Sequence, residues 1–238
     1  SRTTDPGRAY VLFGQAGGFA ANIDLGTLNG TNGFRLDGVA SLDRAGQSVA
    51  GAGDVNGDGF DDLIVGALRA DANGVETGGA YVVFGHGGSF GASLSLGALD
   101  GSNGLVLQGV GSGDRTGVPV AGLGDVDGDG FADVLVGAPR ADGAQTDSGA
   151  GYVVLGRDFT GDVRFVGGDG DDVFHGAQGD RIVGGRGEDT LSGAGGNVLL
   201  GGAGDDVLVW DASHLRIDGG GGEDTLQVIG QGVTLDLS

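Results

Sequence analysis

The segment Asp54-Val-Asn-Gly-Asp-Gly-Phe-Asp-Asp-Leu-Ile-Val-Gly-Ala67 returns 71 residues later as Asp125-Val-Asp-Gly-Asp-Gly-Phe-Ala-Asp-Val-Leu-Val-Gly-Ala138. In both copies an acidic loop of nine residues leads into an apolar run of strand length. Oxygen-bearing side chains at the first, third, fifth and ninth loop positions would converge on one point. At about 4 Å and an effective dielectric of about 20, each pair of carboxylates there costs roughly 4 kcal/mol. The loops therefore predict a bound cation, and the all-oxygen donor set favours Ca²⁺ over Zn²⁺ and Mg²⁺.

The composition extends this acidic, glycine-rich chemistry to all 238 residues of the chain. Glycine accounts for 58 residues, and the 33 acidic residues are Asp except for Glu76, Glu188 and Glu223. Gly supplies positive φ and Asp bonds its own backbone or a metal, so this composition is typical of turns. The formal charge of −21 excludes a protein that tracks nucleic-acid phosphates, and anionic lipid would repel it. Because this charge opposes compaction in metal-free water, we expect folding to depend on the ion.

Two further classes of structure are not expected from the sequence. The apolar runs are all shorter than the roughly 20 residues of a membrane span, so no membrane insertion is expected. The chain contains no Cys, which excludes a disulfide framework and a thiol nucleophile.

The repeat of 71 residues organises positions 8 to 160. Each of Tyr10, Tyr81 and Tyr152 begins an apolar run such as Tyr81-Val-Val-Phe-Gly85, and the acidic loops follow in register. These short runs lie between Gly and Asp breaks, which is typical of β-strands. No segment predicts a helix, so the sequence predicts an all-β fold.

The signatures that flank the acidic loops resemble a known family. Phe13-Gly14 with Gly66-Ala67-Leu68, and Phe84-Gly85 with Gly137-Ala138-Pro139, are similar to FG-GAP repeats, the blades of integrin-α-type β-propellers. The resemblance implies antiparallel blades over residues 1–163, with the end of one blade followed by two repeats, and about two bound Ca²⁺ ions. Its implied ligands are Asp54, Asn56, Asp58, the carbonyl of Phe60 and Asp62 in the first loop, and Asp125, Asp127, Asp129, the carbonyl of Phe131 and Asp133 in the second.

Three further details bear on this interpretation. An EF-hand shares the first half of the loop pattern, but its twelfth position would be Val65 or Val136 and a strand follows where a helix is required. A propeller typically has about four to eight blades, so this one is incomplete in the chain and would be completed by another copy or by the rest of a longer polypeptide. Asp61 is expected to face solvent, because the second loop has Ala132 at that position.

From Gly167 the period shortens to about nine. The segments Gly167-Gly-Asp-Gly-Asp-Asp-Val-Phe-His175, Gly184-Gly-Arg-Gly-Glu-Asp-Thr-Leu-Ser192, Gly201-Gly-Ala-Gly-Asp-Asp-Val-Leu-Val209 and Gly219-Gly-Gly-Gly-Glu-Asp-Thr-Leu-Gln227 resemble the nonapeptides of RTX proteins, which form a Ca²⁺-binding parallel β-helix. The resemblance implies a parallel β-roll over residues 164–238, in which two nonapeptides make one coil.

The spacing of the complete nonapeptides predicts a one-sided roll. They begin 17, 17 and 18 residues apart, so they stack on one edge, and about three ions are expected in the gaps between them. Phe174, Leu191, Leu208 and Leu226 are expected to face inward, whereas the opposite edge, around Arg181 and Asn197, is expected to be metal-poor. The implied ligands are the side chains of Asp172, Asp189, Asp206 and Asp224, with turn positions Gly167, Asp169, Gly184, Arg186, Gly201, Ala203, Gly219 and Gly221.

Catalytic chemistry is not expected within these residues. Gly87-Gly-Ser-Phe-Gly91 matches a hydrolase nucleophile pattern, but so glycine-rich a chain produces such matches by accident. There is no HExxH pair and no Lys, which excludes zincin, P-loop and Schiff-base mechanisms.

The resemblance to RTX proteins thus implies a non-enzymatic, extracellular segment of a bacterial RTX-type surface or secreted protein, a family that usually uses type I secretion. Calcium would fold it outside the cell, where it would serve adhesion or scaffolding with a cell-surface protein or carbohydrate as ligand. The alternative is a calcium-binding accessory or secretion domain of a secreted enzyme such as a protease, lipase or epimerase.

Overall fold

The computed structural model describes residues 5–71, 75–143, 145–211 and 213–229. Its elements are β-strands and two single-turn 3₁₀ helices, η1 (Leu25–Thr27) and η2 (Leu96–Ala98), which confirms the all-β prediction. The chain divides into two compact units. The first contains Ser1–Ala52, Asp62–Gly122 and Val134–Val154, and the second contains Gly53–Asp61, Leu123–Asp133 and Leu155–Ser238. Both acidic loops therefore group with the C-terminal repeats, whereas the predicted domain boundary falls after residue 163.

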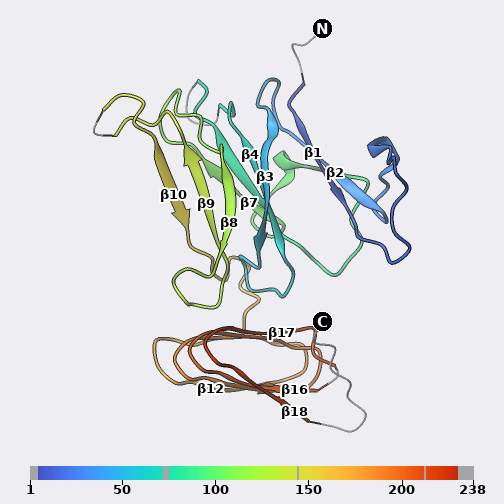
Figure 1. Cartoon of the computed structure of the whole chain (residues 1–238), viewed down its shortest axis with the longest axis vertical. Helices are drawn as coiled ribbons and strands as arrows, with labels where there is room; N and C mark the ends of the chain where they lie inside the picture. The colour runs from blue at the N-terminus through green and yellow to red at the C-terminus, as the bar shows by residue number, and fades with distance from the viewer. Residues whose placement is uncertain (1–4, 72–74, 144, 212, 230–238) are drawn as a thin grey trace. The chain divides into compact units, whose positions relative to one another are not determined.

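Three sheets carry the 71-residue repeat (Figure 1). In one of these sheets the first two strands are antiparallel and the last two are parallel. In the other two sheets, Gly79–Val83 is antiparallel to both Asp62–Ala67 and Gly104–Gln108, and Asp133–Ala138 is antiparallel to Ala150–Val154. In order across each sheet, the strands are β1 (Arg8–Leu12), β2 (Gly33–Asp37) and β6 (Ser93–Ser95); β3 (Ala45–Gly53), β4 (Asp62–Ala67), β5 (Gly79–Val83) and β7 (Gly104–Gln108); and β10 (Ala150–Val154), β9 (Asp133–Ala138) and β8 (Val120–Gly124).

The sequence repeat is also a repeat of backbone hydrogen bonds. The amide of Gly78 donates to the carbonyl of Ala70, and the amide of Gly149 donates to that of Ala141, both at 2.9 Å. The pairs β1–β2 and β5–β7 are equivalent in this repeat, whereas among the described strands β10 has no partner equivalent to β7. Buried apolar residues, including Phe34, Leu36 and Val83, form the core of the first unit.

The C-terminal repeats form a flattened coil with two parallel sheets (Figure 1). Ile182 pairs with Leu199, and Leu199 pairs with Ile217, so the chain advances by the spacing of the nonapeptides at each coil. One sheet contains β11 (Phe165–Val166), β13 (Arg181–Arg186), β15 (Val198–Ala203) and β17 (Arg216–Gly221), and the other contains β12 (Val173–Gly176), β14 (Thr190–Gly193), β16 (Val207–Trp210) and β18 (Thr225–Val228).

The interior of this roll is a narrow apolar stack. Ile182, Leu191, Leu199 and Leu208 are at most 2 % exposed and pack together, with the partly buried Phe174 against them. The inward orientation predicted for Leu191 and Leu208 is confirmed. Leu226 pairs in register with the inward-facing Leu208 but is 39 % exposed, because β18 is the last described strand of its sheet and has a neighbour on one side only. No helix in the described residues is long and apolar enough to cross a membrane.

Candidate metal centres

The second acidic loop brings three carboxylates together. One oxygen from each of Asp125, Asp127 and Asp133 lies within 4.8 Å of the others. The amides of Gly128 and Gly130 donate to Asp125 at 2.6 and 2.7 Å, which fixes the first carboxylate at the base of the loop. The backbone of the loop therefore holds the Asp125 carboxylate in place without help from a cation.

The remaining bonds of this loop orient the other predicted ligands. Asp133 accepts the amides of Val126 and Gly156 at 2.7 and 2.8 Å. Asp129 accepts the amide of Phe131 at 3.0 Å, while Oδ1 of Asp127 is buried and accepts no hydrogen bond from the described residues. A buried carboxylate oxygen without a donor is costly unless a cation neutralises it. The donor set therefore fits a hard, oxygen-preferring ion such as Ca²⁺.

The first loop repeats these backbone hydrogen bonds around Asp54, whereas in the described residues the three carboxylates that converge within 4.8 Å belong to the second loop. The Asp54 carboxylate accepts the amides of Asp58 and Gly59 at 3.0 and 2.8 Å, and Asp58 accepts the amide of Phe60 at 2.9 Å. The side-chain amide of Asn56 donates to Asp58 at 3.1 Å. Four of the predicted ligand residues are thus held by one loop.

Asp62, the fifth predicted ligand residue of the first loop, begins β4 in the first unit. There its carboxylate accepts the amide of Gly85 at 2.8 Å. Asp133 of the second loop accepts the amide of Gly156 in the same way, so the ninth position of each loop also ties the chain to the strand end that follows.

Burial raises the proton affinity of both loops. It raises the pKa of Asp54 to about 6, against the opposing effect of the Gly59 amide. Burial also raises the pKa of Asp129 to about 6, and the charges of Asp127 and Asp125 add to this shift. Each loop consequently holds negative charge at neutral pH that the fold alone does not fully compensate.

A column of aspartates runs along one edge of the roll. The amide of Asp172 donates to Oδ1 of Asp189 at 2.8 Å, that of Asp189 to Asp206 at 2.8 Å, and that of Asp206 to Asp224 at 3.0 Å. Oδ1 of Asp189, Asp206 and Asp224 therefore accepts an amide from the coil before it, whereas Oδ2 of Asp172 accepts the amide of Gly168 at 3.0 Å. Oδ2 of Asp189 and of Asp206 is buried and accepts no hydrogen bond from the described residues.

Glycine carbonyls lie beside these oxygens. A Cβ placed on Gly184 would lie 2.3 Å from Oδ2 of Asp189 and 2.4 Å from the carbonyl oxygen of Gly201. On Gly201 it would meet Oδ2 of Asp206 at 2.2 Å and the carbonyl oxygen of Gly219 at 2.3 Å. Only Gly leaves room for these oxygens to approach one another, and such a cluster of carboxylate and carbonyl oxygens suits Ca²⁺.

Burial and neighbouring charge act on this column as they do on the loops. Burial raises the pKa of Asp206 to about 6, and the charges of Asp189 and Asp224 raise it further. The pKa of Asp189 is raised as well, again mainly by burial. At neutral pH the negative charge of this column is therefore not fully compensated by the fold, as in the two loops.

The opposite edge of the roll has an amide where this column has carboxylates. Oδ1 of Asn197 accepts the amide of Asp180 at 3.0 Å, as the aspartates do on the first edge. Its Nδ2 lies 2.0 Å from the place that a Cβ on Gly193 would take. Because an N–H group cannot ligate a cation, this position fits the metal-poor edge that the sequence predicts.

The family described as FG-GAP repeat matches residues 45–83 and 118–155. Each matched range contains one acidic loop and the strands around it. The chain contains FG-GAP repeats. This confirms the resemblance read from the Phe-Gly and Gly-Ala signatures.

Similarity to integrin α chains supports the FG-GAP assignment. The chain is 33% identical to integrin alpha-5 of Xenopus laevis over 138 residues, which cover 55% of the chain and 12% of that protein. It is 38% identical to human integrin alpha-IIb over 128 residues (52% of the chain, 11% of that protein). It is 39% identical to integrin alpha pat-2 of Caenorhabditis elegans over 102 residues (42% and 8%). The chain thus spans about a tenth of the length of these relatives.

The predicted FG-GAP ligands lie on the two acidic loops, and the predicted aspartate ligands of the roll lie along one of its edges. At the third motif position, the carbonyls of Ala203 and Gly221 accept amides from Gly187 and Gly204, at 2.9 and 2.7 Å. Asp169 accepts a hydrogen bond from the side chain of Arg186 at 3.2 Å. Metal ligation by all these residues, and by the first-position residues Gly167 and Gly219, stays a prediction.

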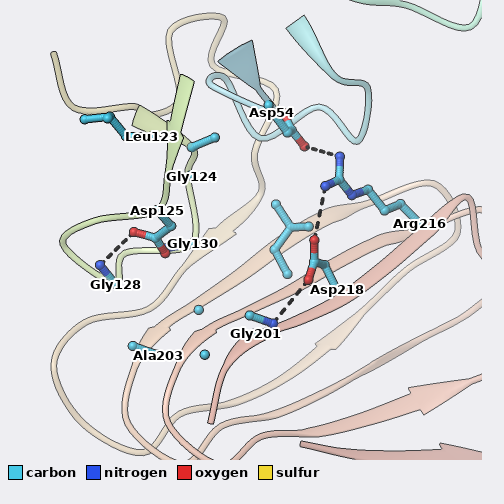
Figure 2. A pocket seen from close by; sticks show the side chains of 16 residues that line it. Asp54, Leu123, Gly124, Asp125, Gly128, Gly130, Gly201, Ala203, Arg216 and Asp218 are labelled. Atoms are coloured by element: carbon cyan, nitrogen blue, oxygen red, sulfur yellow. Dashed lines mark hydrogen bonds and ion pairs between the residues drawn. The ribbon is translucent and has the colours of Figure 1, made fainter. Parts of the chain in front are cut away.

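Sequence reasoning missed the arginines that face the FG-GAP loops. Arg216 of β17 lies 3.7 Å from Asp54 and pairs with Asp218 at 3.1 Å (Figure 2). It also lies 3.1 Å from Asp61. Asp61 is exposed as predicted, but it has this partner. These contacts join segments about 155 residues apart, and the spacing of the repeats gives no signal for them.

Proposed function

We propose that this chain is an extracellular, calcium-stabilised binding or scaffolding module of a secreted or surface protein. The observation that carries the proposal is the convergence of Asp125, Asp127 and Asp133 on one point of the second FG-GAP loop. The buried oxygens of Asp189 and Asp206 support the same chemistry in the roll. The proposal includes about two ions in the loops and about three in the roll.

The proposed mechanism is folding controlled by the ion. Calcium-free carboxylates repel one another and lose hydration on burial, so the acidic chain would stay loose where calcium is scarce. Extracellular calcium modules commonly bind with dissociation constants of about 10⁻⁴ to 10⁻³ M, which matches a switch between the inside and the outside of a cell. The proposal includes export of the unfolded chain by a bacterial type I system. The RTX-like nonapeptides are the feature that supports this part of the proposal.

Calcium titration of the full chain tests this function. Isothermal titration calorimetry of the chelator-treated protein should show several bound ions, and far-UV circular dichroism should gain β signal over the same calcium range. Mg²⁺ at equal concentration is the control, because its octahedral preference suits these flexible loops poorly. Absence of bound calcium at about 10 mM, well above the affinities expected for such modules, would contradict the proposal.

An open sheet edge supports a role in binding other polypeptides. β10 lies at the edge of its sheet, and Val153 on it is 52 % exposed. In the equivalent place β5 pairs with β7, where Tyr81 is opposite Val106. We therefore propose that a strand from another copy or from the rest of a longer polypeptide completes this blade, because unpaired edges favour strand addition.

Sedimentation velocity across protein concentration tests completion by another copy. Self-association that Val153→Pro abolishes would support this arrangement, since the amide of Val153 faces the open edge and Pro removes it, whereas the amide of Gly156 and those in step with it face β9. A monomer at all concentrations would exclude another copy as the source of the strand. The ligands we propose for the exposed loops remain a cell-surface protein or a carbohydrate.

A further inference from the structure

The outward face of one roll sheet is apolar. Val183, Val198 and Leu200 lie on β13 and β15 and alternate with the inward-facing Ile182 and Leu199. These three side chains are 0 to 4 % exposed, and they form a cluster with Phe131 of the second FG-GAP loop. A roll that stood alone would present this face to water, so its composition indicates a permanent cover.

The glycines of the FG-GAP loops fit this face closely. A Cβ on Gly59 would lie 2.5 Å from Val198, and one on Gly130 would lie 2.4 Å from Val183. Both glycines occupy the sixth loop position and have positive φ, 90° and 86°. The residue type that the turn requires thus also allows the roll to approach the loop backbone.

Two arginines of β13 hold the backbone of the loops. Nε of Arg181 donates to the carbonyl oxygen of Asp58 at 3.0 Å, and Nε of Arg186 donates to that of Asp127 at 2.6 Å. Both acceptors belong to residues whose side chains are predicted calcium ligands. A guanidinium fixed in this way restricts the peptide on which the ligand is mounted.

Arg216 and Asp125 line one hollow of about 490 Å³, bounded by both loops and by β15 and β17 (Figure 2). Arg216 supplies a positive charge close to Asp54, so the roll contributes charge as well as apolar contact to the first loop. The contacts between loops and roll therefore combine packing, hydrogen bonding and ion pairing.

We propose that Arg181, Arg186 and the outward valines of the roll are positioning residues for the FG-GAP calcium loops, so that calcium bound by the roll and calcium bound by the loops are linked. This inference rests on the proposed function. With the roll ligands occupied, β13 and β15 would be ordered, and their side chains would hold the loops in the geometry that the loop ligands need. Linkage is reciprocal, so calcium in the loops must stabilise the roll by the same factor.

Hydrogen exchange measured by mass spectrometry on the full chain tests the linkage. Calcium is titrated, and protection is followed separately in peptides from 53–61 and 123–133 and in peptides from the roll. Asp206→Asn removes a predicted roll ligand, and the calcium midpoint for protection of the loops should rise about five- to tenfold. Asp205→Asn is the matched control, because it removes one exposed charge from the neighbouring residue and leaves an oxygen to accept the Glu223 amide.

Substitution of Arg186 provides a second test that keeps the four aspartates of the column and the carbonyl of residue 186, while it frees the side chain of Asp169. Removal of a positive charge near a cation site would by itself tighten calcium binding. A higher loop midpoint in Arg186→Met, with recovery in Arg186→Lys, would therefore show lost positioning. Arg164→Met is the charge control, since Arg164 pairs with Asp180.

The outcomes separate this inference from the proposed function. Loop midpoints unchanged in Asp206→Asn, and unchanged or lower in Arg186→Met, would overturn the linkage while leaving calcium binding intact. If neither loops nor roll respond to calcium in the parent protein, the proposed function itself fails.

Discussion

Replacing Asp206 by Asn should affect calcium-free and calcium-loaded protein in opposite ways. Asp206 is 1 % exposed, and burial with neighbouring charge raises its pKa from 3.8 to about 6. At about 1.4 kcal/mol for each tenfold change in proton affinity, keeping this carboxylate ionised at neutral pH costs at most roughly 3 kcal/mol. An amide of the same shape removes this cost, and Asn197 shows that the roll accepts an amide at an equivalent position.

In calcium the same substitution removes a ligand. At about 10 mM calcium and a dissociation constant of about 10⁻⁴ M, each bound ion stabilises the fold by about 2.7 kcal/mol. The calcium-induced gain in stability of Asp206→Asn should therefore be smaller than that of the parent by about this amount for each ion lost.

Thermal unfolding followed by circular dichroism measures both effects. With EDTA at pH 7.5, where the proposed mechanism leaves the parent largely loose, Asp206→Asn should keep more β signal than the parent and lose it at a temperature several degrees higher, since about 1 kcal/mol corresponds to about 2–4 °C in a chain of this size. Asp205→Asn should change the melting temperature little, because this side chain is exposed. A lower melting temperature of Asp206→Asn in EDTA, or an unchanged calcium gain, would refute the reasoning.

Three further perturbations follow from the same structure. Burial raises the pKa of Asp129 and of other site carboxylates to about 6, so the calcium-free fold binds more protons than the unfolded chain between about pH 4 and 6. Its stability should therefore fall as pH rises through this window and then level off. Melting temperatures in EDTA that rise with pH instead would contradict this. Asp58→Ala combined with Asp129→Ala should remove about two ions from the calorimetric stoichiometry and leave the roll ions, and an unchanged stoichiometry would disprove the loop sites. Gly59→Ala should lower the free energy of unfolding, measured in urea, by more than about 1 kcal/mol, since it adds a clash with Val198 to the strain of positive φ. Gly161→Ala is the control, because Gly161 has a φ of 78° and open space around it, so this variant measures the strain alone. Equal losses of stability in the two variants would exclude the clash.

Periodic features of the structure could be predicted from the sequence. Tyr81 and Tyr152 lie in β5 and β10, and the apolar runs after the acidic loops form β4 and β9, because strand length and Gly-Asp breaks are local signals. The advance from Ile182 to Leu199 could be counted directly from the nonapeptides. The convergence of Asp125 and Asp127 also followed from local turn chemistry.

Contacts between distant segments could not be predicted in this way. Arg216 meets Asp54 through the path of the whole chain, and no periodic signal links these positions. One clue was present in the sequence: Val198 and Leu200 flank the inward-facing Leu199, so this strand is apolar on both faces. Such a strand is expected to be covered on both sides, and the cover proved to be the acidic loops.

The glycine edge of the roll sets the distance between its coils. A Cβ on Gly202 would lie 2.0 Å from the carbonyl oxygen of Gly185, and one on Gly220 would lie 2.1 Å from that of Gly202. The peptide units of successive coils thus stack directly on one another, and no larger side chain separates them. The spacing of the backbone between coils would then determine which ionic radius fits. Replacing one carboxylate oxygen by an amide nitrogen would prevent an ion from binding at that coil.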